Sequence, residues 1–158
     1  MHFFCFGFFF LPGYELVTPP LDGMILPGVT RDSVLTLGRE HASGAYTVPG
    51  LPEDLTVTER PVTMMEVREA SHSGKLVEMF GAGAYFNSTF DTGSWSQFFA
   101  SLQGTAAVIS PVDRIGYQGE DVLIPTGEDG MGPISRHIWT ELIGRQTGTI
   151  SSDWSVVI

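Results

Sequence analysis

Strand-like and helix-like segments alternate along most of this chain, and this alternation is the feature that most constrains its fold. Apolar residues recur at helical spacing at 34–37 and again at 134–143, whereas 105–111 is an almost continuous apolar run. Such a run is typical of a strand that is buried on both faces of a sheet. The order of these segments predicts an α/β domain in which helices flank a central sheet.

Turn and cap signals set the boundaries of these elements. Thr63 and Glu66 have the spacing of a capping box for a helix that Gly74 ends, and residues 45–54, which contain prolines and glycines, are expected to form a loop. The sequence predicts strands at 15–18, 55–60, 76–80, 105–111 and 154–158, helices at 30–41, 64–73 and from 133 onward, and a hairpin of 114–117 with 121–124 around 118–119.

Length and composition fit one globular domain. The 158 residues can bury a core, and a hydrophobic content of 42% with 16% charged residues argues against a disordered chain. A net charge of −10 argues against direct binding of nucleic acid. The single cysteine, Cys5, has no partner for an internal disulfide, and the four histidines lack metal-ligand spacing, so we predict no metal site.

The first ten residues form an apolar segment, MHFFCFGFFF. The segment is too short to span a membrane, and it lacks the Lys or Arg expected at the start of a secretory signal, although a weak signal core is an alternative interpretation. We therefore expect no membrane partner, and we interpret residues 1–14 as an apolar N-terminus outside the domain.

Residues 15–31 form the segment that says most about the chemistry of this chain. Pro27-Gly28 predicts a tight turn, and a helix that begins near Thr30 leaves unpaired N–H groups at its start. Those groups, a threonine hydroxyl and the positive end of the helix dipole suit a phosphate group. The residues therefore predict a site for a phosphorylated ligand.

The same segment carries a family resemblance. TPPLDG at 18–23, followed by ILPGVTR at 25–31, resembles the second domain of branched-chain amino acid aminotransferases, which are pyridoxal-phosphate enzymes of fold type IV. The resemblance covers 15–158 and implies the C-terminal domain of the D-amino acid aminotransferase-like fold, a mixed sheet with flanking helices. Further matches follow in order at VTER (57–60), EMFG (78–81), TAAVISPV (105–112) and IPT (124–126).

One tract interrupts the resemblance. In the family, a Gly-x-Gly-Thr turn joins two strands directly, whereas residues 84–104 separate Gly83 from Thr105 in this chain. This tract matches nothing in the family and resembles an intron that is read through in frame. We therefore predict a domain at 15–158 that is interrupted by an insertion at 84–104.

The resemblance also implies an activity and a set of contacts. Branched-chain-amino-acid transaminases move an amino group from leucine, isoleucine or valine to 2-oxoglutarate and use pyridoxal 5′-phosphate as cofactor. By resemblance, Val29, Thr30 and Thr105 contact the cofactor phosphate, and Ala106 and Ala107 face the substrate carboxylate. The family implies homodimers in the cytosol or the mitochondrion, with branched-chain amino acids and 2-oxo acids as partners.

Two other parts of a transaminase have no counterpart here. In the family, the Schiff-base lysine and the carboxylate that pairs with the pyridine nitrogen lie upstream of the position that matches Glu15. The only lysine, Lys75, matches an ordinary surface residue and is expected to be a solvated charge, so we predict no catalytic residue in this chain. Arg31 either supports the phosphate cradle or forms a surface ion pair. Two hypotheses stay open: part of a branched-chain amino acid aminotransferase, or a truncated or mis-assembled domain without catalysis and with at most weak phosphate binding.

Overall fold

The computed structural model describes residues 5–10, 13–23, 25, 27–82 and 108–154. The described strands are β1 (Cys5–Phe10), β2 (Glu15–Thr18), β3 (Thr56–Glu59), β4 (Leu76–Ala82), β5 (Ile109–Pro111), β6 (Arg114–Tyr117) and β7 (Glu120–Leu123). The described helices are α1 (Val29–Ser43), α2 (Met64–His72) and α4 (Pro133–Gln146).

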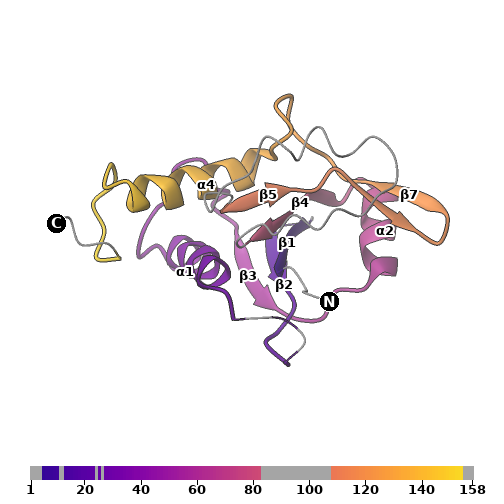
Figure 1. Cartoon of the computed structure of the whole chain (residues 1–158), viewed down its shortest axis with the longest axis horizontal. Helices are drawn as coiled ribbons and strands as arrows, with labels where there is room; N and C mark the ends of the chain where they lie inside the picture. The colour runs from indigo at the N-terminus through magenta and orange to yellow at the C-terminus, as the bar shows by residue number, and fades with distance from the viewer. Residues whose placement is uncertain (1–4, 11–12, 24, 26, 83–107, 155–158) are drawn as a thin grey trace, which may run out of the picture.

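Five strands form one mixed sheet in the order β3-β2-β1-β4-β5 (Figure 1). β2 and β3 are parallel, with Thr18 opposite Glu59, and the other neighbouring strands are antiparallel. β6 and β7 form a separate hairpin whose turn residues, Gln118 and Gly119, have φ values of 51° and 83°, as an I′-type turn requires. This mixed sheet with flanking helices confirms the predicted fold class.

β1 lies in the middle of the sheet, between β2 and β4. Its register pairs Cys5 with Ala82 at one end and Phe10 with Leu76 at the other. An apolar segment suits a central strand, although the sequence analysis assigned no strand there. Six of the first fourteen residues therefore share the sheet with the rest of the chain, and the boundary at residue 14 stays a prediction about family membership.

Helix ends follow the local signals in the sequence. α1 ends at Gly44, whose φ of 74° is left-handed, and Gly74, with φ of 67°, follows α2. The Thr63 hydroxyl accepts a hydrogen bond from the Glu66 N–H at 3.2 Å, so half of the predicted capping box forms. The Glu66 carboxylate instead pairs with Arg60 at 2.8 Å.

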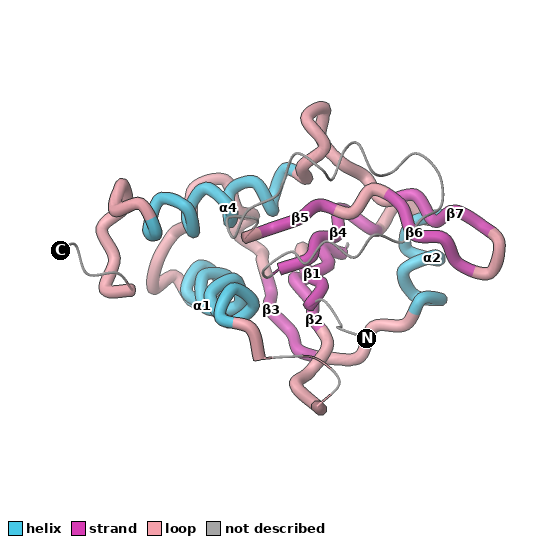
Figure 2. The backbone as a smooth tube through the Cα atoms, in the orientation of Figure 1, coloured by secondary structure: helices cyan, strands magenta, loops and turns pink. Residues whose placement is uncertain are grey.

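Both faces of the sheet are covered. α1 and α4 cover one face, where Leu16 and Phe80 are buried, and α2 with the β6–β7 hairpin covers the other, where Val17 and Met79 are buried (Figure 2). Adjacent residues of β2 and β4 thus enter opposite clusters, as the alternation of a strand demands. The sheet therefore has apolar residues on both faces and a helix pair on one of them.

Three predicted segments differ from the structure or lie outside it. The predicted loop at 45–54 is confirmed, but Trp154, predicted to open a closing strand, lies in a turn, and 155–158 fall outside the described residues. Of the predicted strand 105–111, residues 109–111 form β5, whereas 105–107 are outside the described part of the chain. The predicted insertion at 84–104 also lies outside it.

Candidate functional site

One edge of the sheet collects several strand ends. β2, β3 and β4 end there, and β5 begins there, because Thr18 is paired with Glu59 and Ala82 with Ile109. Cys5 of β1, which pairs with Ala82, lies at the same edge. We call this edge, defined by Thr18, Glu59, Ala82 and Ile109, the carboxyl edge.

The amino end of α1 lies at the carboxyl edge. Arg31, in the first turn, donates from Nη2 to the carbonyl oxygen of Pro19 at 2.9 Å and to Oε2 of Glu59 at 2.5 Å. Pro19 follows β2 directly, and Glu59 is the last residue of β3. The structure therefore places the two predicted phosphate contacts, Val29 and Thr30, at this edge, with Val29 83% exposed.

The first-turn N–H groups of α1 have no side-chain acceptor among the described residues. Gly28 is the N-cap and offers no side chain, with φ of −75° and ψ of 136°. The first intrahelical bond runs from the Asp32 N–H to the Gly28 carbonyl at 3.1 Å. The N–H groups that precede it point out of the helix, where the helix dipole favours an anion.

Cationic and acidic side chains both lie near this helix start, and Asp32 is the acid in its first turn. The Glu59 carboxylate binds Arg31 through one oxygen and Arg39 through the other, each at 2.5 Å, and these guanidinium groups hold the pKa of Glu59 below its ordinary value. Two guanidinium groups therefore face one carboxylate in a chain whose net charge is −10. Arg31 is only 5% exposed while the Glu59 side chain is 31% exposed, so this ion pair is half-buried.

A phosphate group fits these residues. Open N–H groups and the Thr30 hydroxyl are donors that a dianion can use, and the buried Arg31 guanidinium lies in the same first turn. The Nε of Arg31 is buried and has no hydrogen-bond partner within the described residues. Keeping a buried arginine at this position, with one donor unsatisfied among the described residues, has a cost in stability.

The other predicted contacts, Thr105, Ala106 and Ala107, lie outside the described residues and stay predictions. The described chain resumes at Val108, which is buried, next to Ile109 at the carboxyl edge. The register of β4 and β5 thus brings the two described ends of the chain around 83–107 to the edge that also carries the start of α1.

Lys75 lies at the opposite edge of the sheet. It immediately precedes β4, which runs about 20 Å from Leu76 to Ala82 at a rise of about 3.3 Å per residue. Its side chain is exposed, and its backbone N–H donates to the carbonyl of Ala70 at 2.8 Å. Lys75 therefore lies far from the start of α1.

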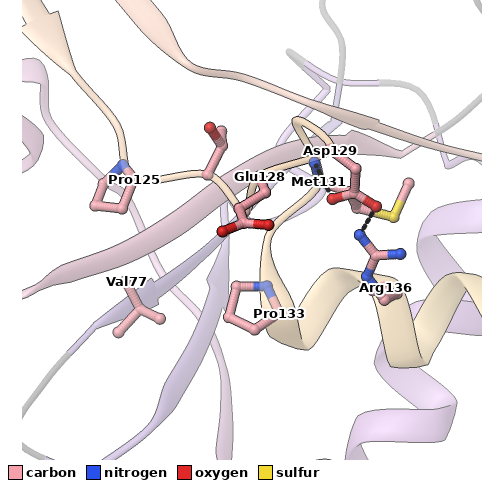
Figure 3. A pocket seen from close by; sticks show the side chains of 9 residues that line it. Val77, Pro125, Glu128, Asp129, Met131, Pro133 and Arg136 are labelled. Carbon is pink, nitrogen blue, oxygen red and sulfur yellow. Dashed lines mark hydrogen bonds and ion pairs between the residues drawn. The ribbon is translucent and has the colours of Figure 1, made fainter.

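A pocket that the sequence analysis did not predict also lies toward this opposite edge, beside Val77 near the start of β4. Figure 3 shows the carboxylate of Glu128 close to Pro133 and the ion pair between Arg136 and Asp129. The pocket is open, with a volume of about 680 Å³. Neither Val29 nor Thr30 is among the described residues that line it, which are Val77, Pro125, Thr126, Gly127, Glu128, Asp129, Met131, Pro133 and Arg136.

Next to this pocket, a buried carboxylate closes the amino end of α4. Glu78, 1% exposed, accepts hydrogen bonds from the Ser135 N–H at 2.5 Å and the Ile134 N–H at 3.3 Å. Burial raises the pKa of Glu78 to about 7, although these backbone bonds oppose the shift. A Cβ at Gly132 would overlap this carboxylate. The signal for this contact, a lone acid within an apolar strand, was present in the sequence.

Neither a metal centre nor a membrane span emerges from the described residues. No group of three His, Cys, Asp or Glu side chains in that part of the chain could hold a metal ion. None of its helices is long and apolar enough to cross a bilayer. His41 instead joins the end of α1 to the next loop, with Nδ1 accepting from the Val48 N–H at 3.1 Å and Nε2 lying 3.0 Å from the Pro52 carbonyl oxygen.

Curated proteins similar to this chain are branched-chain-amino-acid aminotransferases, although no family model matches it. The protein from Monosiga brevicollis is 34% identical over 144 residues, that from Dictyostelium discoideum 36% over 146, and the cytosolic protein from Saccharomyces cerevisiae 38% over 147. Each alignment covers 91% of this chain. The chain spans only 29% to 31% of the length of these relatives.

Solved structures give the same fold. The branched-chain amino acid aminotransferase from Escherichia coli matches 96% of this chain with a TM-score of 0.54 and 24% sequence identity. The match covers 36% of that chain. The similar proteins include cytosolic and mitochondrial forms.

Proposed function

Since this chain is homologous over about nine-tenths of its length to part of the branched-chain-amino-acid aminotransferases, we propose that it forms the portion of such a transaminase that holds the phosphate group of pyridoxal 5′-phosphate. In the complete enzyme, the reaction would transfer an amino group from leucine, isoleucine or valine to 2-oxoglutarate. The cofactor, when bound, supplies the electron sink for that chemistry.

One observation supports this role above the others: no described side chain accepts a hydrogen bond from the first turn of α1. Among the described helices, α2 has the Thr63 hydroxyl at its start and α4 has the Glu78 carboxylate. The first turn of α1 has no such oxygen from any described side chain. A helix start with free donors, placed where several strands end, is the arrangement that binds phosphate in other folds.

In this proposal, each residue has a simple task. The N–H groups of Val29 and Thr30 and the Thr30 hydroxyl donate hydrogen bonds to the phosphate oxygens. Thr105 donates from the connection between β4 and β5, and Ala106, with Ala107 beside it, binds the substrate carboxylate through backbone N–H groups. Apolar walls then favour branched aliphatic side chains over polar ones.

Residues 1–158 alone are proposed to bind phosphate without transamination. Their only lysine lies at the edge of the sheet opposite the start of α1. This is the second hypothesis of the sequence analysis. It concerns the activity of this polypeptide, not the family from which the polypeptide descends. For the complete enzyme, we propose a homodimer in the cytosol or the mitochondrion.

Titration of the purified chain with pyridoxal 5′-phosphate tests the proposal. We expect binding that inorganic phosphate competes away, no transamination, and the same absorbance spectrum in the Lys75→Ala variant. Pyridoxal, which lacks the phosphate, serves as the matched ligand control. Equal affinity for the two compounds would refute a phosphate cradle, and a Schiff-base absorbance that disappears in Lys75→Ala would refute the assignment of Lys75 as a solvated charge.

A further inference from the structure

We propose that Arg31 is the positioning residue of this cradle. By joining the first turn of α1 to the ends of β2 and β3, Arg31 sets the direction in which the N–H groups of Val29 and Thr30 point. The inference rests on the proposed function only in the identity of the anion, because the contacts of Arg31 are a property of the chain itself.

The guanidinium of Arg31 connects three segments that are distant in sequence. Nη2 bonds to the Pro19 carbonyl, 12 positions away, and to Glu59, 28 positions away. The Arg31 side chain is buried and both contacts are partly buried, so water has limited access to them. Because a guanidinium is planar and rigid, a turn of the helix start would strain both bonds together.

Glu59 is itself held in place from the other side. Arg39, two turns further along α1, binds its second oxygen, and the two arginines share one carboxylate. Arg39 differs in burial, since its side chain is 51% exposed while that of Arg31 is 5% exposed. Only Arg31 also reaches the end of β2. Arg31 and Arg39 therefore carry the same charge and bind the same carboxylate, but only Arg31 of the two also makes the proposed positioning contact.

A displaced helix start would matter for a phosphate. Hydrogen bonds to phosphate are directional, and a shift of about 1 Å at such a site can cost a large part of its effect. The register of the sheet fixes β2 and β3 relative to each other, so contacts from the start of α1 to both strands fix the position of the helix start relative to the sheet. The buried, unpaired Nε is the energetic cost of this arrangement within the described residues.

The test compares Arg31→Met with Arg39→Met in the full chain. Each replacement keeps an apolar stem and removes a guanidinium. Two quantities are measured: affinity for pyridoxal 5′-phosphate relative to pyridoxal, and hydrogen exchange of the Asp32 N–H, the first bonded amide of α1. We expect Arg31→Met to lose about tenfold in relative affinity and to exchange about tenfold faster, and Arg39→Met to change by about twofold or less.

The Arg31→Lys variant distinguishes an effect of guanidinium geometry from an effect of charge. It also tests the positioning role if Arg31→Met fails to fold. Lysine keeps the charge but not the fork, so we expect fast exchange and an affinity that stays below that of the unmodified chain. Full affinity with slow exchange in Arg31→Lys would overturn the positioning role, and so would unchanged exchange in Arg31→Met. If the unmodified chain does not prefer the phosphorylated compound, the proposed function fails, while the exchange measurement still decides the role of Arg31.

Discussion

α1 and α4 have similar N-cap residues, but the N–H groups of their first turns have different surroundings. Both follow a glycine with extended backbone, Gly28 at φ −75° and ψ 136° and Gly132 at φ −67° and ψ 154°. At α4, the Glu78 carboxylate fills the position of the absent cap side chain. At α1, no described side chain does so, and a cation lies beside the helix start. The same local sequence signal thus produces a closed end and an open one.

The difference arises from the strands beneath the two helices. β4 presents its acid directly to the first N–H groups of α4, so that helix start is neutralised within the protein. Glu59, at the end of β3, is turned toward Arg31 and Arg39 and is therefore not available to the helix N–H groups. An acid near a helix start closes it only when no arginine competes for the carboxylate.

Adding a methyl group to each N-cap glycine is expected to produce the largest effect. In Gly132→Ala the new Cβ overlaps the Glu78 carboxylate, so we expect a loss of about 3 kcal/mol in the free energy of unfolding. In Gly28→Ala no atom lies within 4 Å of the new Cβ, and the expected loss is below about 1 kcal/mol. Urea denaturation measures both, and equal losses would contradict the distinction between a closed and an open end.

The closed end should also respond to pH. Because the pKa of Glu78 is raised from 4.5 to about 7, the folded state holds more protons than the unfolded state in this interval, and the free energy of unfolding should fall as pH rises through it. The slope contributed by one carboxyl is at most about 1.4 kcal/mol per pH unit. Glu78→Gln should remove this slope.

The loss of stability at lower pH provides a control for this prediction. The pKa values of Glu15 and Glu59 are lowered chiefly by hydrogen bonds to arginines, so their contribution is present above 4.5 and is lost as pH falls below it. That acid loss should persist in Glu78→Gln. An unchanged slope between pH 4.5 and 7 in this variant would show that the Glu78 carboxyl group does not titrate there.

α2 provides a third case, with an ordinary side-chain cap. Thr63→Ala removes the hydroxyl that accepts from the Glu66 N–H, and we expect a loss of about 1 kcal/mol in the free energy of unfolding. Thr47→Ala, at an exposed loop position, should stay within about 0.5 kcal/mol. If Thr63→Ala loses much more free energy of unfolding than Gly28→Ala, the start of α2 is closed by a side chain, as the start of α4 is.

The smallest expected change in stability comes from capping α1 artificially. Gly28 has a backbone conformation that other residues adopt and open space around its Cβ position, so Gly28→Asp can place a carboxylate over the first turn. We expect a gain of about 0.5 kcal/mol in the free energy of unfolding and weaker binding of pyridoxal 5′-phosphate, since an internal anion then occupies the cradle. Greater stability with unchanged binding would locate the ligand elsewhere.

Local chemistry made part of this fold predictable. The threonine at 63, the glycine at 74 and the pair at 118–119 act on their own neighbours, and the structure confirms the helix ends and the turn that they predicted. The central place of β1 and the contact of Glu78 with α4 depend on partners far along the chain; Ser135 is 57 residues from Glu78. Such contacts leave no periodic signal, so the sequence analysis missed them.

The candidate site divides in the same way. The sequence predicted the start of α1 from one turn signal, and the helix does begin there, at Val29. It left open whether Arg31 faces solvent, because burial of that side chain depends on where β2 and β3 end. The contacts at Thr105, Ala106 and Ala107 stay predictions.

The pairing of Ala82 with Ile109 has a consequence for how this domain can change over evolution. These two residues are neighbours across paired strands although they are far apart in sequence, so codons gained or lost between them need not shift the register of the described strands. Each doubling of such a connection costs only about 0.6 kcal/mol in closure entropy. This point of the gene is therefore one where splicing variants and engineered grafts are thermodynamically inexpensive.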